Sequence, residues 1–292
     1  MHTYLDPAVL SKLKTMELRA RIIVEGALIG IHRSPYHGFS TEFKDHRNYQ
    51  AGDELKRIDW KVYARSNKFY TKQFEEESNL NVYIVLDGSA SMKYTSTTLS
   101  KFEYASYLAA SLSWLFMKQK DAVGLAIFDE KLSVFQPPAT TKSHLARLMK
   151  ILDESKPSNN TKIVSNIDTL LAQIKKRSLI IILSDLLIPT ADIVKAVKNI
   201  SARGNEVIIF HILDDSEYKL KINESIILKD IETEAEISVT PTLKSSYEKE
   251  LNKCIDLYKK TFRSRNVDYL LIRTSEPLEN ALIYYLAKHK QK

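Results

Sequence analysis

The sequence contains a single cysteine, Cys254, among its 292 residues. One cysteine cannot form an internal disulfide or a cysteine-rich zinc site, and its isolation fits a reducing compartment. Long apolar runs are also missing, because stretches such as Ser178–Leu183 fall far short of the roughly 20 residues that a membrane-spanning helix needs. The N-terminus has no basic region followed by an apolar run, which a secretory signal would require. We therefore expect a cytoplasmic protein without a membrane span.

Glycine is scarce, with only seven in the chain, and neither G-x-x-x-x-G-K-S/T nor G-x-G-x-x-G occurs. A glycine-rich loop that cradles phosphates is therefore excluded. The 43 basic residues exceed the 36 acidic ones by seven, but the two signs are interleaved, as in Lys44-Asp45. Because no basic stripe emerges to follow a phosphate backbone, we expect no nucleic-acid partner.

Apolar runs separated by helical patterns dominate the chain after residue 80. Five of them are strand-like and nearly continuous, at residues 81–86, 121–128, 178–184, 206–213 and 268–273. Strands of this kind are buried on both faces, which is typical of a mainly parallel sheet covered by helices. A sixth run, at 131–135, follows the second after only two residues and must therefore be an antiparallel edge strand. The sequence predicts a doubly wound α/β fold with six strands.

The first 79 residues have a different pattern. After Asp6-Pro7, apolar residues at helical spacing predict one helix that ends near Glu25. Alternation around Trp60, followed by Phe69 and Phe74, predicts a β-hairpin. We expect residues 1–79 to form a helix-and-hairpin extension packed on the main domain. Residues 80–292 would form that domain, with a hairpin insertion at about 214–241.

Oxygen-bearing side chains follow two of the predicted strands. Asp87, Ser89 and Ser91 come after the first strand, and Asp185 follows the fourth. In a doubly wound sheet of order 3-2-1-4-5-6 these two strands are neighbours, and ligands bind at their carboxyl ends. A cluster of oxygens without His or Cys suits Mg²⁺ or another hard divalent cation. The simplest alternative is that the serines only cap a helix.

The D-x-S-x-S motif and the later Asp resemble the metal-ion-dependent adhesion site of von Willebrand factor type A domains. The resemblance implies a further threonine, for which Thr161 is the best match and Thr140 and Thr141 are rivals. It also implies a Mg²⁺ ion held by hydroxyls, with the two carboxylates acting through water. In this arrangement a partner protein's Asp or Glu would complete the octahedron. The implied metal-site residues are Asp87, Ser89, Ser91, Thr161 and Asp185.

A second resemblance covers nearly the whole chain. The chain is similar to the bacterial family called domain of unknown function 58 in four segments. These are Tyr49-Gln-Ala-Gly-Asp53, Arg57-Ile-Asp-Trp-Lys61, Ala64-Arg65 and the closing run 267–274. Members of that family carry an N-terminal hairpin extension on the type A fold. They are associated with MoxR-type AAA+ ATPases as adaptors or chaperone components.

Together these resemblances imply a Mg²⁺-dependent protein-interaction module that is not an enzyme. One alternative is a metal-assisted phosphohydrolase that uses Asp87 and Asp185. It would need a second Asp two residues after the first, and Ser89 stands there. A third possibility is a scaffold whose metal site is degenerate and whose hairpin binds the partner.

Overall fold

The computed structural model describes residues 7–33, 47–48, 63, 70–71, 80–129, 131–158, 163–220, 226–229, 236–239 and 241–289. The strands are β1 (Arg47–Asn48), β2 (Tyr70–Thr71), β3 (Asn81–Asp87), β4 (Ala122–Phe128), β5 (Leu132–Ala139), β6 (Leu179–Ser184), β7 (Glu206–Leu213), β8 (Ile226–Lys229), β9 (Glu236–Val239) and β10 (Asp268–Arg273). The helices are α1 (Pro7–Leu10), α2 (Met16–Arg33), the 3₁₀ helix η3 (Ala90–Lys93), α4 (Lys101–Lys118), α5 (Lys142–Glu154), α6 (Ile163–Gln173), α7 (Thr190–Ala202), α8 (Asp215–Tyr218), α9 (Pro241–Arg263) and α10 (Glu279–His289).

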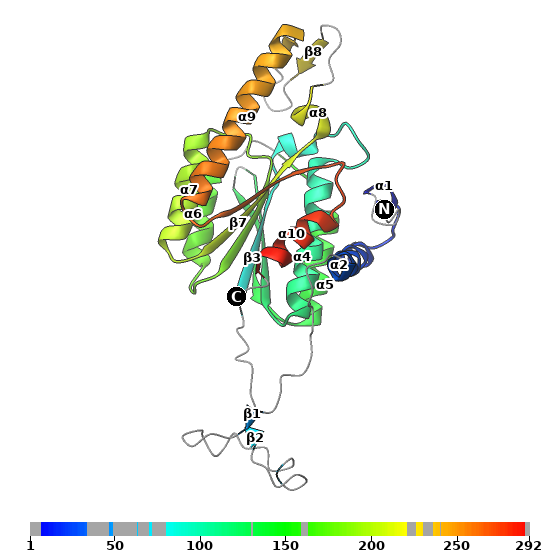
Figure 1. Ribbon diagram of the computed structural model, residues 1–292, viewed down its shortest axis with the longest axis vertical. Coiled ribbons are helices and arrows are strands. Elements are labelled where there is room, and N and C mark those ends of the chain that lie inside the picture. The colour runs from blue at the N-terminus through cyan, green and yellow to red at the C-terminus, as the bar shows by residue number, and fades with distance from the viewer. Residues whose placement is uncertain are drawn as a thin grey trace.

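Six strands form one sheet in the order β10-β7-β6-β3-β4-β5 (Figure 1). Five of them are parallel, and β5 pairs antiparallel with β4 at one edge. The predicted doubly wound fold and its antiparallel edge strand are confirmed, since this order is the predicted one read from the other edge. β3 lies between β4 and β6, and Leu86 pairs with Leu183. The carboxyl ends of β3 and β6 are therefore adjacent.

Helices cover both faces of the sheet (Figure 1). On one face α2, α4, α5 and α10 share a core with alternate β3 residues such as Ile84. On the other face α6, α7 and α9 pack on the intervening residues, such as Val85. Because both faces are buried, the central strands β3, β4 and β6 are apolar at nearly every position, which is the pattern read in the sequence.

The N-terminal helix prediction is wrong in its extent. α1 ends at Leu10, and α2 begins at Met16 and continues to Arg33, well past Glu25. Between them, the Arg19 side chain donates hydrogen bonds to the carbonyl oxygens of Leu10 and Leu13, at 3.2 and 2.6 Å. The Leu10 carbonyl oxygen also accepts the Leu13 N–H, at 3.1 Å, so the turn after α1 is closed by backbone and side chain together. The chain can therefore break there, although its apolar spacing continues.

The structure describes only parts of the two predicted hairpins. β8 and β9 pair antiparallel within the segment predicted as an insertion. β1 pairs antiparallel with β2. Most of the first predicted hairpin, including Trp60, lies outside the described residues, so its packing stays a prediction. Within the described ranges, none of the helices combines the length and apolar character needed to cross a bilayer.

Candidate metal-binding site

The loop that leaves β3 is fixed by hydrogen bonds to Asp87, whose side chain is only 3% exposed. One carboxylate oxygen, Oδ1, accepts the Ser89 backbone N–H at 3.0 Å, and Oδ2 accepts the Ser184 hydroxyl at 2.6 Å. Ser184 is the last residue of β6, so this bond joins the two strand ends. A Cβ at Gly88 would meet the Phe128 carbonyl oxygen at 3.3 Å, which favours glycine where the loop passes so close to β4.

Two hydroxyls lie together at the end of this loop. The Oγ atoms of Ser89 and Ser91 are 3.0 Å apart. Neighbouring ligands of an octahedral Mg²⁺, each about 2.1 Å from the metal, are separated by about 3 Å. The spacing of the hydroxyls and the all-oxygen chemistry of the site both fit such an ion.

Asp185 follows β6 in a strained turn. The next residue, Leu186, has φ 53°, a left-handed conformation that is uncommon for a residue with a Cβ. The Leu186 N–H donates to Ser184 Oγ at 3.0 Å, and the Asp185 carbonyl oxygen lies 2.9 Å from Nε2 of the buried His211. Backbone strain of this kind persists only where its surroundings hold it, and it often marks a functional site.

The two carboxylates interact electrostatically. Burial and, next, the nearby charge of Asp185 raise the pKa of Asp87 to about 6, and the hydrogen bonds from Ser184 and Ser89 offset only part of this rise. A divalent cation nearby would stabilise the ionised form of Asp87. The site therefore has the charge that a metal would balance.

One group that balances this charge was not predicted from the sequence. Lys101 is fully buried, and its Nζ lies 2.7 Å from Asp185 Oδ2 and 2.6 Å from Glu217 Oε1. Burial opposes the ammonium charge, but the two carboxylates outweigh this effect and raise the pKa of Lys101. The only signal in the sequence is a lysine in the first turn of an otherwise apolar helix, where the helix dipole disfavours a cation.

The rival threonines lie at the wrong end of the sheet. β5 ends at Ala139, which pairs with Val123 near the start of β4, so Thr140 and Thr141 follow at the amino end of the parallel strands. Thr141 caps α5 there by accepting the His144 N–H at 3.2 Å. The structure thus brings together Asp87, Ser89, Ser91 and Asp185, but neither of these threonines.

Thr161 lies outside the described residues, and its role stays a prediction. The chain just before it is held against the loop that leaves β3, because the Ser158 N–H donates to the Gly88 carbonyl oxygen at 2.8 Å. Lys93 Nζ also donates to the Ser158 carbonyl oxygen, at 3.3 Å. The segment that carries Thr161 therefore starts beside the site.

A zinc site built from acidic, histidine and cysteine side chains finds no support. Among the described residues, no three or more His, Cys, Asp or Glu side chains are grouped so that they could hold a metal. The candidate site depends instead on serine hydroxyls supported by two carboxylates.

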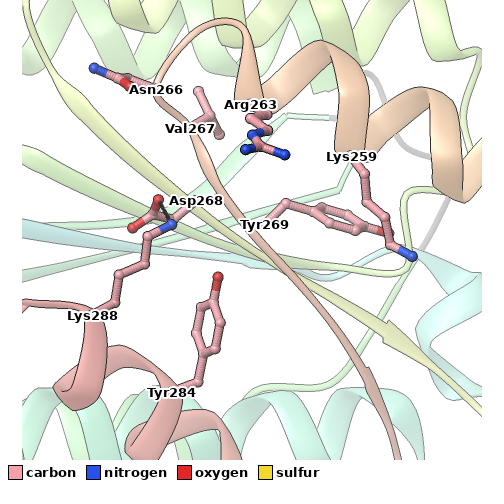
Figure 2. Close-up of a pocket in the computed structure, with 8 residues that line it drawn as sticks. All are labelled: Lys259, Arg263, Asn266, Val267, Asp268, Tyr269, Tyr284 and Lys288. Carbon is pink, nitrogen blue, oxygen red and sulfur yellow. Dashed lines mark hydrogen bonds and ion pairs between the residues drawn. The ribbon is translucent and has the colours of Figure 1, made fainter.

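Away from the candidate metal site, a pocket of about 290 Å³ lies at the amino end of β10 (Figure 2). Its cations are Lys259 and Arg263 from α9 and Lys288 from α10, and Lys288 is paired with Asp268. Both helices end here, and cations in a last turn stabilise the partial negative charge of a helix carboxyl end. The basic character of this pocket is thus explained by the helix ends, and it lies at the opposite end of the sheet from Asp87.

A family model described as "Protein of unknown function DUF58" matches residues 45–253. An uncharacterized protein of Mycobacterium tuberculosis is 24% identical over 291 residues, which cover 98% of this chain and 91% of the relative.

Solved structures show a more distant similarity. The conserved hypothetical protein BatB from Bacteroides thetaiotaomicron has a TM-score of 0.48 at 18% identity, covering 73% of this chain and 100% of that one. The VWA domain of SpRpn10 has a TM-score of 0.41 at 12% identity, covering 70% and 93%.

Proposed function

Because the chain belongs to the family of unknown function DUF58, whose model spans more than half of it, we propose that it is a Mg²⁺-dependent protein-interaction module with no catalytic activity of its own. Ser89, Ser91 and Thr161 would hold the metal, and Asp87 and Asp185 would act on it through water. Other divalent cations with the same preference for oxygen would also fit. The observation that carries the proposal is the pair of hydroxyls 3.0 Å apart beside two buried carboxylates.

A metal held mainly by neutral hydroxyls keeps most of its positive charge and attracts an anionic ligand. The carboxylate of a partner's Asp or Glu supplies that ligand and brings the partner's surface to the loop. Leu187, two residues after Asp185, is 58% exposed. An exposed leucine beside a charged centre suits a protein interface, in which apolar contact surrounds one strong polar bond.

The partner proposed here is a MoxR-like AAA+ ATPase, with this chain as its adaptor or chaperone component. The support for this assignment is the family resemblance carried by the segments 49–53 and 57–61. The charge of the site adds only that the partner presents a carboxylate.

The phosphohydrolase alternative is less well supported. Ser89 stands where the general acid would be needed. Turnover of phosphate esters that is lost in Asp87→Ala would overturn the non-enzymatic proposal.

The test compares the thermal midpoint of the full chain in millimolar Mg²⁺ and in EDTA, and repeats a pull-down from the native cell under both conditions. A ligand bound only by the folded state stabilises it by about 2.7 kcal/mol at a hundredfold excess over its Kd. We expect a higher midpoint in Mg²⁺ and a partner that is released by EDTA. Equal midpoints together with EDTA-resistant capture would contradict the proposal.

A further inference from the structure

Lys101 lies at the centre of the candidate site but belongs to neither sequence motif. It is the first residue of α4, directly after the capping box formed by Ser100 and Glu103. Its side chain is fully buried, and its ammonium group contacts the carboxylates of Asp185 and Glu217 at 2.7 and 2.6 Å. Lysine is almost never buried to this degree unless it is paired.

This placement is costly in two ways. The first turn of a helix has partial positive charge, which disfavours a lysine there. Removing an ammonium group from water also has an energetic cost, which only well-placed partners offset. Neither cost is needed for helix formation, since Ser100 and Glu103 already cap α4.

Glu217 links Lys101 to α8. Its other carboxylate oxygen, Oε2, accepts the Asp214 backbone N–H at 2.9 Å and so closes the cap of this short helix. Its carbonyl oxygen accepts the Tyr247 hydroxyl of α9, also at 2.9 Å. One ammonium group thus connects Asp185 with α8. In the chain, α8 lies between β7 and α9 (Figure 1).

We propose that Lys101 is a built-in cation of the metal site: it balances Asp185 and Glu217 when no metal is bound and competes with a divalent cation for Asp185. This inference rests on the proposed metal site. Asp87, Asp185 and Glu217 supply three carboxylates against one ammonium group. The remaining negative charge attracts a divalent cation, while the lysine limits its affinity.

The first test is Lys101→Met in the full chain, which keeps the length of the side chain and removes its charge. In EDTA the thermal midpoint falls, because two buried carboxylates lose their partner. Mg²⁺ then raises the midpoint by more than it does in the wild type. In calorimetry with Mg²⁺ alone, the Kd falls about tenfold, because a repelling charge near the metal has been removed.

The second variant, Glu217→Gln, changes the charge in the opposite direction and keeps an acceptor for Lys101. Its Mg²⁺ Kd rises severalfold, because Asp185 alone then holds the ammonium group. Both variants remove the ion pair between Lys101 and Glu217. If the role of Lys101 were purely structural, they could not change the Mg²⁺ affinity in opposite directions. If Lys101→Met does not fold, Glu217→Gln decides the question. Lys118→Met, an exposed site on the same helix, is the control and leaves the Mg²⁺ response unchanged.

The outcomes separate this inference from the proposed function. A wild type that responds to Mg²⁺ and a Lys101→Met variant that responds equally would overturn the role of Lys101 and leave the metal site standing. If Mg²⁺ raises the midpoint of Lys101→Met but not that of the wild type, Lys101 is supported as the cation that replaces the metal. The same result would overturn the proposed function. No response in either protein would overturn both.

Discussion

Ser184 illustrates how single residues join the parts of the site. Its hydroxyl donates to Asp87 Oδ2 at 2.6 Å and accepts the Leu186 N–H at 3.0 Å. One side chain therefore orients the carboxylate after β3 and stabilises the strained turn after β6. In the sequence, this serine is only the polar end of an apolar run.

Replacing both Ser89 and Ser91 separates the proposed Mg²⁺ binding from folding. We expect the Ser89→Ala/Ser91→Ala variant to keep the wild-type thermal midpoint in EDTA to within a few degrees, because two small hydroxyls at a loop leave no core cavity. Its midpoint no longer rises in Mg²⁺, because two metal ligands are gone. Thermal unfolding under the two conditions measures this difference. A variant that still responds like the wild type would place the metal elsewhere.

Asp121 makes the stability of the fold depend on pH, independently of the proposed metal site. Burial raises its pKa to about 6, although the carboxylate accepts the Leu80 N–H at 3.2 Å. The folded protein therefore holds this proton more tightly than the unfolded chain, whose Asp pKa is near 3.9. The stability that Asp121 contributes is full below about pH 4 and is lost as the pH rises through about 6.

The variant Asp121→Asn has no proton to lose. Relative to the wild type, we expect it to be more stable at about pH 8 than at about pH 4, as measured by denaturant unfolding at both pH values. If the difference in free energy of unfolding between the two proteins is the same at both pH values, this carboxylate keeps its ordinary pKa in the folded state.

At the scale of elements, α2 is part of the main core. Its buried residues Ala20, Ile23 and Ala27 belong to the cluster that includes α4 and alternate residues of β3. Apolar spacing predicted a helix here, but it could not predict where the helix starts. The break involves Arg19, which donates to the carbonyl of Leu10 at the end of α1 and to that of Leu13 beyond it. It also involves Thr15, whose hydroxyl accepts the Leu18 N–H at 3.2 Å.

A matched pair of isoleucines in α2 tests this packing. Ile23 is fully buried, whereas Ile29 is 49% exposed. We expect Ile23→Ala to lower the free energy of unfolding by about 3 kcal/mol, because it leaves a cavity between α2 and the rest of the core. Ile29→Ala should change it by less than about 1 kcal/mol. Equal effects in denaturant unfolding would contradict the observed orientation of the helix.

At the scale of the whole molecule, the sequence predicted what depends on local pattern. Strands buried on both faces appear as continuous apolar runs, so the five parallel strands of the main sheet could be predicted. The partly buried edge strand β5 followed from its short connection to β4, and the strand order followed from the doubly wound fold, which brings Asp87 and Asp185 together. Lys101 could not be predicted, since its partners Asp185 and Glu217 lie 84 and 116 residues away. The one local signal, a lysine in the first turn of a largely apolar helix, does not show which carboxylates it contacts.

The adjacency of β3 and β6 also has a consequence for the order of events during folding. The bond between Ser184 and Asp87 spans 97 residues, and β4, β5, α4 and α5 lie within that loop. Contacts this far apart in the chain form late, because closing the loop costs entropy before any contact is made. An ion held by the proposed site would therefore find its ligands only in a nearly native chain. In stopped-flow experiments, we expect Mg²⁺ to slow unfolding and to leave the refolding rate unchanged, whereas faster refolding would mean that the two loops meet before the sheet is complete.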